Sequence, residues 1–239
     1  MTSKHRWQYN EMQQIGTDYQ DEANVQAYDE RMARLRDVKS EVKSIMDDMG
    51  ITKESTVIEI GCGTGNFSVE ASKHCKKVYS VDISETMLEF AEKKAGSVKS
   101  DNITFINAGF LTYQHTEEPV DLVVSQLALH HLPDFWKMVA LLRMNQMLKL
   151  EGKLFLSDII FSFGVDCFEE SISSWLDQIG ESGGANMMHE TEMHIREEYS
   201  TFSWVMEGML SRSGFSINKI DRKSEFMTAY TCTKNVNEE

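Results

Sequence analysis

The chain alternates short runs of apolar and β-branched residues with longer stretches in which apolar positions recur at helical spacing. From residue 55 onward the alternation is regular, which is typical of the β–α–β units that build a parallel sheet. The predicted strands are residues 56–60, 77–81, 103–107, 121–125, 153–159, 215–220 and 227–233. The predicted helices are residues 65–73, 84–95, 134–148 and 201–212. The pattern therefore predicts an α/β fold.

Two segments do not follow this alternation. Within residues 1–54 an apolar stripe at helical spacing ends at Gly50, so this part is predicted to form a helical N-terminal cap. The stripe is formed by Met32, Leu35, Val38, Val42 and Met46. Residues 161–199 form a long insertion after the fifth strand, and insertions of this kind are usually lids or binding segments. We expect a core at 55–160, a lid or substrate insertion at 161–199, and a helix and strand pair at 200–239 that complete the core.

Composition narrows the classes of partner. The 239 residues contain 24 Lys and Arg against 38 Asp and Glu, a net charge of −14, which makes nucleic acid an unlikely substrate. The apolar runs are too short to cross a bilayer and the first residues lack a signal-peptide core, so we expect a cytoplasmic protein. The four cysteines show no paired spacing and are interpreted as reduced thiols.

The stretch VIEIGCGTGNFSVE, residues 57–70, places glycines directly after the first predicted strand. A dinucleotide fingerprint needs G-x-G-x-x-G, but Gly65 falls one position early and Glu59 would repel a pyrophosphate. A ligand with an ammonium group beside a carboxylate satisfies both features, because loop N–H groups bind the carboxylate and Glu59 binds the ammonium group. Asp82 ends the second strand, from which an acid accepts ribose hydroxyls. Together these residues indicate a nucleoside joined to an amino acid.

The motif Glu59-Ile-Gly61-Cys-Gly63-Thr-Gly65, followed by Asp82, resembles that of class I S-adenosylmethionine-dependent methyltransferases. The resemblance is strong over residues 55–160. It implies S-adenosylmethionine as cofactor, in-line methyl transfer, and a Rossmann-like, doubly wound, seven-stranded sheet that is mostly parallel with an antiparallel C-terminal strand. The cofactor-binding residues that we predict are Glu59, Gly61, Cys62, Gly63, Thr64, Gly65, Asp82, Ile83, Met87, Gly109, Phe110, Ser125, Gln126 and Leu127.

The end of the third strand departs from the family pattern. Members of the family often have an Asp here that accepts from the adenine amino group, whereas this chain has Gly109. We therefore expect backbone groups around Ala108–Phe110 to contact the adenine, with Phe110 or Met87 packing on the ring.

The stretch VDLVVSQLALHHLPD, residues 120–134, resembles the branch that includes ubiquinone- and menaquinone-type methyltransferases, which implies a small-molecule acceptor. His130 is a candidate general base, although His130 and His131 alternatively only shape the wall of the site. The N-terminal stretch GTDYQDEANVQAYDERM resembles the cap of the same branch, which makes Tyr19 and Tyr28 further candidate catalytic residues. Trp7 and Tyr9 either close the site or anchor the cap.

Other interpretations are weaker. The stretch MMHETEMH misses H-E-x-x-H because Met193 takes the second histidine position, so the sequence predicts no metal site. A catalytically silent donor-binding or scaffold protein is the main alternative function, and an NAD-dependent oxidoreductase is a weaker one. The sequence specifies neither the acceptor atom nor the oligomeric state.

Overall fold

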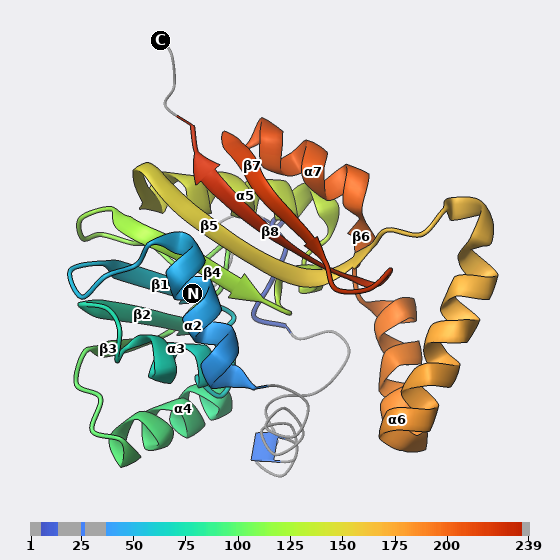
Figure 1. Ribbon diagram of the computed structural model, residues 1–239, viewed down its shortest axis with the longest axis horizontal. Coiled ribbons are helices and arrows are strands. Elements are labelled where there is room, and N and C mark those ends of the chain that lie inside the picture. The colour runs from blue at the N-terminus through green and yellow to red at the C-terminus, as the bar shows by residue number, and fades with distance from the viewer. Residues whose placement is uncertain (1–5, 14–24, 27–36, 236–239) are drawn as a thin grey trace.

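The structure is a computed structural model that describes residues 6–13, 25–26 and 37–235. At its centre lies a twisted sheet whose strands run in the order β3-β2-β1-β4-β5-β8-β7, with a short strand β6 paired to β5 (Figure 1). The strands are β1 Thr56–Ile60, β2 Lys77–Asp82, β3 Ile103–Asn107, β4 Val120–Gln126, β5 Leu148–Phe161, β6 Thr201–Phe202, β7 Phe215–Arg222 and β8 Met227–Lys234. The seven predicted strands are thus confirmed, with β4 and β5 longer than expected.

Strand direction also follows the expectation. The pairs β3–β2, β2–β1, β1–β4 and β4–β5 are parallel, whereas β8 runs antiparallel to both β5 and β7. The two-residue strand β6 makes the sheet eight-stranded and occupies the positions at which the last helix was predicted to begin. That helix starts instead at Ser203, because Thr201 and Phe202 pair with the end of β5.

Helices cover both faces of the sheet (Figure 1). They are α2 Val38–Met49, α3 Asn66–Ala71, α4 Glu85–Ser97, α5 Asp134–Met147, α6 Phe168–Glu197 and α7 Ser203–Arg212, with short 3₁₀ turns η1 Leu129–His131 and η2 Val165–Cys167. The ends of two helices are specified locally: the Ser84 hydroxyl accepts from Met87 N at the start of α4, and Gly50 adopts a left-handed conformation after α2.

The core consists of two layers, one on each face of the sheet. Successive residues of a strand point to opposite faces, so Val57 packs with α2 and α3, whereas Ile58 packs with α5 and α7. On the first face Val42 and Met46 of α2 are buried, as the apolar stripe predicted. Met32 and Leu35 of that stripe lie outside the described residues, as do Tyr19 and Tyr28.

The insertion after β5 forms a long helical hairpin, which the sequence pattern did not predict. Helix α6 is interrupted at Gly184, whose φ of 79° and ψ of 178° are not helical. The hairpin projects away from the sheet (Figure 1), and every side chain in α6 stays at least partly exposed. Because it buries no apolar stripe, periodicity gave no signal for a helix.

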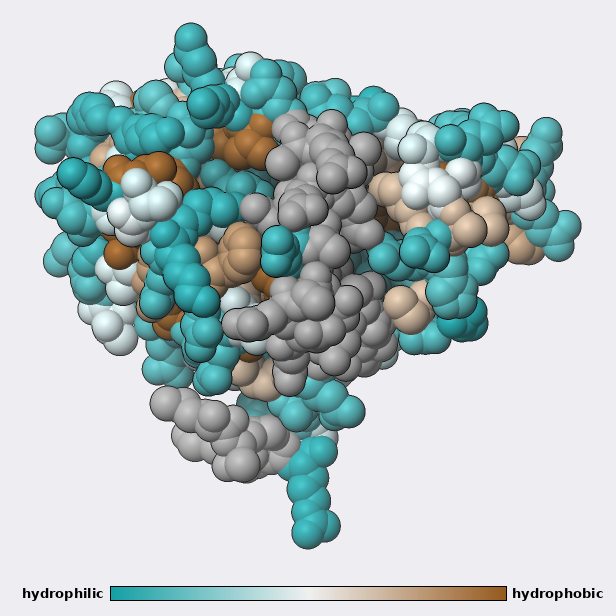
Figure 2. Space-filling model, turned by 90° about the horizontal axis from the view of Figure 1, so that it is seen from below, coloured by the Kyte–Doolittle hydropathy of each residue, from teal (hydrophilic) through white to brown (hydrophobic). Residues whose placement is uncertain are grey.

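On one face of the molecule the described surface is largely polar (Figure 2). Hydrophilic residues dominate the face seen in Figure 2, and hydrophobic ones form separate patches. Of the helices that the structure describes, none combines the length and the apolar character needed to span a membrane.

Candidate active site

A cavity lies at the carboxyl ends of β1, β2 and β4. This is where β1 is flanked by β2 on one side and β4 on the other, the point at which open α/β sheets bind ligands. The cavity is lined by Tyr9, Glu11, Gln13, Val38, Val42, Glu59, Ile60, Gly61, Cys62, Gly63, Thr64, Asn66, Phe67, Asp82, Ile83, Met87, Ala108, Gly109, Phe110, Gln126, Leu127, Ala128, His131 and Leu132. Twelve of the fourteen predicted cofactor-binding residues are among them.

The glycine loop approaches the chain that follows β4. Gly61 has a φ of 79°, and a Cβ on it would lie 2.2 Å from the Cβ of Ala128. Only glycine fits this position, because both the backbone conformation and the space exclude a side chain. The loop is held by its own backbone: Gly61 N and Cys62 N donate to Val81 O, and Gly65 N donates to Cys62 O. Gly65 also has a positive φ, at the start of α3, but it does not line the cavity.

Glu59 is a buried carboxylate at the end of β1. Its side chain is 3% exposed and accepts a hydrogen bond from the Ser68 hydroxyl, which in turn lies 2.8 Å from the Ser80 hydroxyl. The two serines fix the orientation of the carboxylate, which reaches the cavity. An acid buried at this position is costly unless it is paired, and a ligand ammonium group is a suitable partner.

Asp82 lies across the loop from Glu59. One carboxylate oxygen accepts from Gly63 N at 2.8 Å and the other from Ser84 N at 2.9 Å. Burial raises the pKa of Asp82 above its ordinary value, although these N–H donors oppose the shift. Each oxygen retains a lone pair for a further donor, as two ribose hydroxyls require.

At the end of β3 the place of the absent Asp is taken by a residue from the N-terminal segment. A Cβ on Gly109 would lie 2.5 Å from both Cδ and Oε2 of Glu11. Glu11 is 6% exposed and accepts from Leu111 N at 2.9 Å and from the Thr112 hydroxyl at 2.7 Å. Burial raises its pKa above the ordinary value. The carboxylate of Glu11 therefore lies beside the cavity where the family's Asp would lie, although Glu11 is about a hundred residues away in the sequence.

The end of β4 forms the wall opposite the loop. Leu127 has a φ of 53°, a strained conformation for leucine, and its N–H donates to Ser157 O. Gln126 also lines the cavity and donates to Glu41 of α2 at 3.2 Å. Ser125 does not line the cavity, because its side chain is buried within the sheet.

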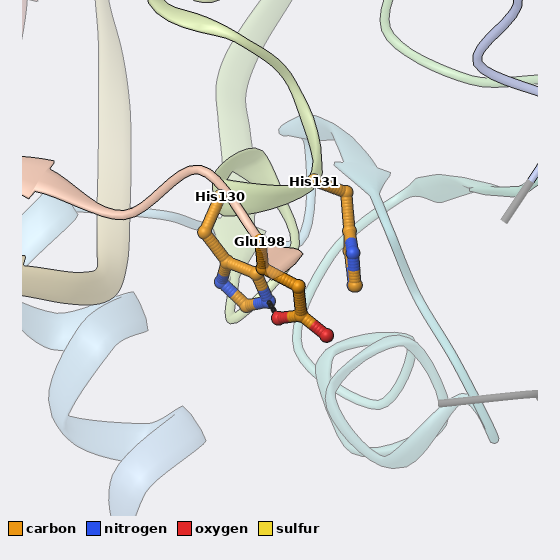
Figure 3. A group of neighbouring side chains, drawn as sticks. All are labelled: His130, His131 and Glu198. Atoms are coloured by element: carbon orange, nitrogen blue, oxygen red, sulfur yellow. Dashed lines mark ion pairs between the residues drawn. The ribbon is translucent and has the colours of Figure 1, made fainter. Parts of the chain in front are cut away.

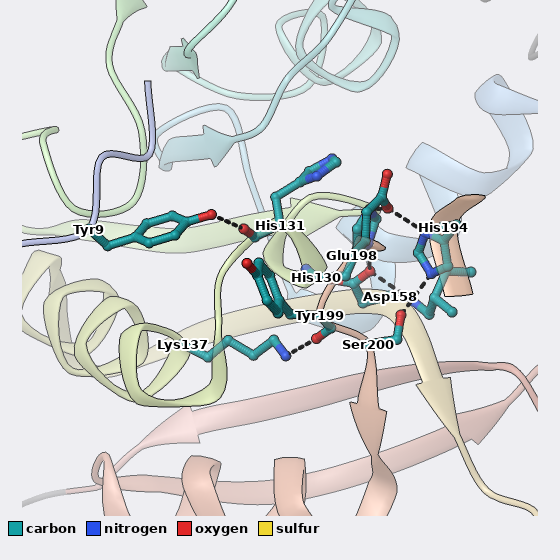
Figure 4. Close-up of polar contacts among 10 residues, drawn as sticks. Tyr9, His130, His131, Lys137, Asp158, His194, Glu198, Tyr199 and Ser200 are labelled. Carbon is teal, nitrogen blue, oxygen red and sulfur yellow. Dashed lines mark hydrogen bonds and ion pairs between the residues drawn. The ribbon is translucent and has the colours of Figure 1, made fainter. Parts of the chain in front are cut away.

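His130, the predicted base, belongs to a buried polar cluster beside the cavity (Figure 4). Its Nδ1 lies 2.5 Å from Asp158 Oδ1, and its Nε2 lies 3.3 Å from Glu198 Oε2. Burial lowers the pKa of His130, but the two carboxylates outweigh burial and hold the pKa above its ordinary value. Both ring nitrogens thus face carboxylates, and the side chain does not line the cavity.

His131 is the histidine that lines the cavity. Burial and the neighbouring His130 lower its pKa to about 4, so the ring is neutral near pH 7. The Tyr9 hydroxyl donates to the His131 carbonyl at 3.2 Å and so ties the N-terminal segment to this wall. Trp7 instead stacks on Trp136 at 6.2 Å and is 69% exposed, an arrangement that anchors the segment.

The segment after α6 is attached to the same wall. Tyr199 N donates to the His130 carbonyl at 2.9 Å, and the buried Lys137 amine donates to the Tyr199 carbonyl. His194, in the last turn of α6, contacts Glu198 and lies 2.7 Å from the Ser200 hydroxyl. His189, the other histidine of the MMHETEMH stretch, is exposed and lies 3.5 Å from Glu192.

Comparison with known proteins identifies the family. A family model described as a methyltransferase domain matches residues 57–152. An uncharacterised methyltransferase of Geobacillus kaustophilus is 30% identical over 193 residues, which cover 81% of this chain and 82% of that protein. The chain belongs to the class I S-adenosylmethionine-dependent methyltransferases.

Solved structures show the same fold in other methyltransferases. A magnesium protoporphyrin IX methyltransferase from Synechocystis, solved with bound S-adenosylhomocysteine, superposes with a TM-score of 0.60 at 19% identity and 83% and 82% coverage of the two chains. An S-adenosylmethionine-dependent methyltransferase from Aquifex aeolicus gives a TM-score of 0.63 at 16% identity, covering 89% of this chain and 98% of that one.

The cavity of this methyltransferase fits its cofactor, S-adenosylmethionine. A buried acid, a glycine loop and a strand-end carboxylate line the cavity together, as the amino-acid and ribose parts of the cofactor require. Sequence reasoning missed Glu11 and the polar cluster around His130. A signal for the cluster was available in Asp158, a carboxylate among the mostly apolar residues at the end of β5.

Proposed function

We propose that this methyltransferase acts on a small-molecule acceptor. The observation that carries the proposal is the lining of the cavity: Tyr9 and Glu11 of the N-terminal segment and Val38 and Val42 of α2 line it together with the strand ends. A recessed site of this kind aligns a small acceptor and limits access of water, which methyl transfer to a nucleophile requires. The net charge of −14 also disfavours nucleic acid.

The donor end of the cavity is assigned by chemistry. Glu59 binds the ammonium group, the glycine loop lies against the amino-acid moiety, and Asp82 accepts the ribose hydroxyls. Glu11 accepts from the adenine amino group in place of the absent Asp, since it is buried beside Gly109 and its Oε2 faces the space that an Asp side chain would fill. S-adenosylmethionine supplies an electrophilic methyl group.

The acceptor end is formed by His131, Leu132 and Ala128. His130 stands behind them with both ring nitrogens directed at carboxylates, so a proton transfer to it requires the contact with Glu198 to open. The segment 161–199 contributes to this end through its last turn, which carries His194. We therefore assign acceptor selection to this insertion and to the N-terminal cap.

Turnover of labelled S-adenosylmethionine against a library of thiols, phenols, amines and quinols tests the proposal. Transfer to one of these classes is expected, with loss of transfer in Glu59→Gln. Calorimetry with S-adenosylhomocysteine, run in parallel, reports donor binding. Donor binding without transfer to any member of the library would instead support a silent donor-binding protein, and transfer only to added RNA or protein would overturn the small-molecule assignment.

A further inference from the structure

Four side chains with metal-ligating atoms meet beside the donor cavity. His130 and His131 come from η1, His194 from the last turn of α6, and Glu198 directly follows that helix. Figure 3 shows His130 in contact with Glu198, which comes from another segment, and the His131 side chain beside this pair. One ligand atom from each of these three residues lies within 4.8 Å of the other two. The fold thus brings together residues that are far apart in the sequence.

The spacing at the centre of the group suits a metal ion. His130 Nε2 lies 3.3 Å from Glu198 Oε2, and the Nδ1 of His194 contacts the same oxygen. Ligands held about 2.0–2.2 Å from a tetrahedral ion lie about 3.3 Å apart, so the first pair already has the separation of two bound ligands. A ring nitrogen of His131 lies within 4.8 Å of a ligand atom of each of the other two.

The hydrogen bonds of the other ring nitrogens also favour a metal site. His130 Nδ1 is held by Asp158 at 2.5 Å, which directs the opposite nitrogen, Nε2, toward Glu198. His194 fixes the orientation of the Glu198 carboxylate, because its Nδ1 contacts that group while its Nε2 lies 2.7 Å from the Ser200 hydroxyl. Metal-binding histidines typically have the second ring nitrogen fixed by a carboxylate or another polar group in this way.

We propose that His130, His131 and Glu198 bind a divalent transition-metal ion, while His194 holds the Glu198 carboxylate in place. Imidazole nitrogens with one carboxylate suit zinc, manganese or cobalt, whereas magnesium and calcium prefer oxygen donors. Because His131 also lines the donor cavity, the ion lies at the acceptor end of the site. If the proposed methyl transfer holds, the ion binds an oxygen or sulfur atom of the acceptor, a step that rests on that proposed function.

A metal-free explanation exists and makes a different prediction. Protons on the imidazole rings can bridge Asp158 and Glu198, and the cluster would then only attach the end of α6 to η1. In that case the carboxylate of Glu198 matters for stability but not for metal affinity. The two explanations are separated by measuring metal binding directly.

The experiment uses the full, tag-free chain after treatment with a chelator. Titration with Zn²⁺ by calorimetry is expected to show one equivalent bound, and Co²⁺ is expected to give a visible absorption band that Zn²⁺ removes. Glu198→Gln should weaken Zn²⁺ binding by at least about a hundredfold, and Asp158→Asn by about 10–100-fold, the usual cost of losing an outer contact. The matched control is Glu192→Gln, which changes an exposed carboxylate next to His189 on the same helix and should leave binding unchanged.

Folding and donor binding are checked separately. Each variant is compared with the parent by thermal unfolding and by calorimetry with S-adenosylhomocysteine, neither of which requires the metal. Absence of stoichiometric Zn²⁺ and Co²⁺ binding in the parent, or equal affinity in a folded Glu198→Gln, would overturn the metal site. Neither result would affect the donor site, whereas loss of S-adenosylhomocysteine binding in the parent would count against the proposed function.

Discussion

The carboxyl group of Glu11 occupies the space into which a side chain at Gly109 would project, with Glu11 Cδ 2.5 Å from the position of a Cβ there. Positions 11 and 109 therefore act as one unit. Glycine at 109 is required for the approach of Glu11, and Glu11 supplies a carboxylate that the end of β3 lacks.

Glu11→Gln is expected to weaken S-adenosylhomocysteine binding about tenfold. A hydrogen bond to a charged group contributes about 1.5–3 kcal/mol, and about 1.4 kcal/mol corresponds to a tenfold change. The analogue in which the adenine amino group is replaced by a carbonyl, S-inosylhomocysteine, reports on the contact itself. Calorimetry should show that the parent discriminates between the two ligands and that the variant has lost most of this discrimination.

Glu92→Gln, which changes an exposed carboxylate on α4, is the control for that measurement. Unaltered discrimination in a folded Glu11→Gln would assign adenine recognition to backbone groups alone.

Glu59→Gln is expected to reduce affinity only for ligands that carry the amino-acid moiety. The variant keeps the shape of the side chain and loses the charge that faces the ammonium group, so S-adenosylhomocysteine should bind about tenfold more weakly or worse. Methylthioadenosine lacks the amino-acid moiety and should bind with unchanged affinity. Equal losses of affinity for both ligands would show a general disturbance of the loop. The control for the loss of one negative charge is Glu54→Gln, at an exposed position before β1.

Donor affinity should fall in mild acid. Burial raises the pKa of Asp82 above its ordinary value, so its carboxylate becomes protonated at a higher pH than exposed carboxylates do. Above this pKa the ionised group accepts both ribose hydroxyls, and below it one acceptor is lost. The dissociation constant for S-adenosylhomocysteine is thus expected to be constant near neutral pH and to rise as the pH falls toward the raised pKa.

Glu11, whose pKa is raised by burial in the same direction, contributes to this fall. The double variant Asp82→Asn with Glu11→Gln should bind weakly at every pH and show a flatter profile. A parent profile that stays flat throughout the acid range would contradict the assignment of both residues.

Gly61→Ala is expected to destabilise the protein and to abolish donor binding. The added Cβ would meet the Cβ of Ala128 at 2.2 Å, and such overpacking costs about 1–3 kcal/mol before the unfavourable positive φ is added. Ala128→Gly in the same chain removes the clash but not the backbone strain, so it should restore part of the free energy of unfolding. Urea denaturation measures the free energy of unfolding of the single and the double variant. If the double variant is no more stable than Gly61→Ala, backbone strain alone is responsible for the loss.

The sequence predicted the sheet well because its central strands β1, β2 and β4 are buried on both faces and appear as β-branched runs between turns. The residues on the donor side of the cavity could be predicted equally well from the sequence, because they lie at or directly after the ends of β1, β2 and β4. Glu11 was not, because its partner Gly109 is brought close only by tertiary folding. Helix α6 was missed for a different reason: with all its side chains partly exposed it has no apolar stripe, and Glu198, just after it, stands in a polar stretch without distinguishing features.

Helix α6 has no buried side chain and contributes no residue to the two layers of the hydrophobic core. Changes of length or sequence around Gly184, at the tip of the hairpin, should therefore cost little folding free energy. The start of the hairpin is constrained by Trp175, which stacks on Phe226, and its last turn by the contact of His194 with Glu198. Divergence among relatives is then expected to concentrate in the hairpin and to spare β1 to α4. Through this division, a lineage can acquire a new acceptor while the part of the chain that binds the donor stays unchanged.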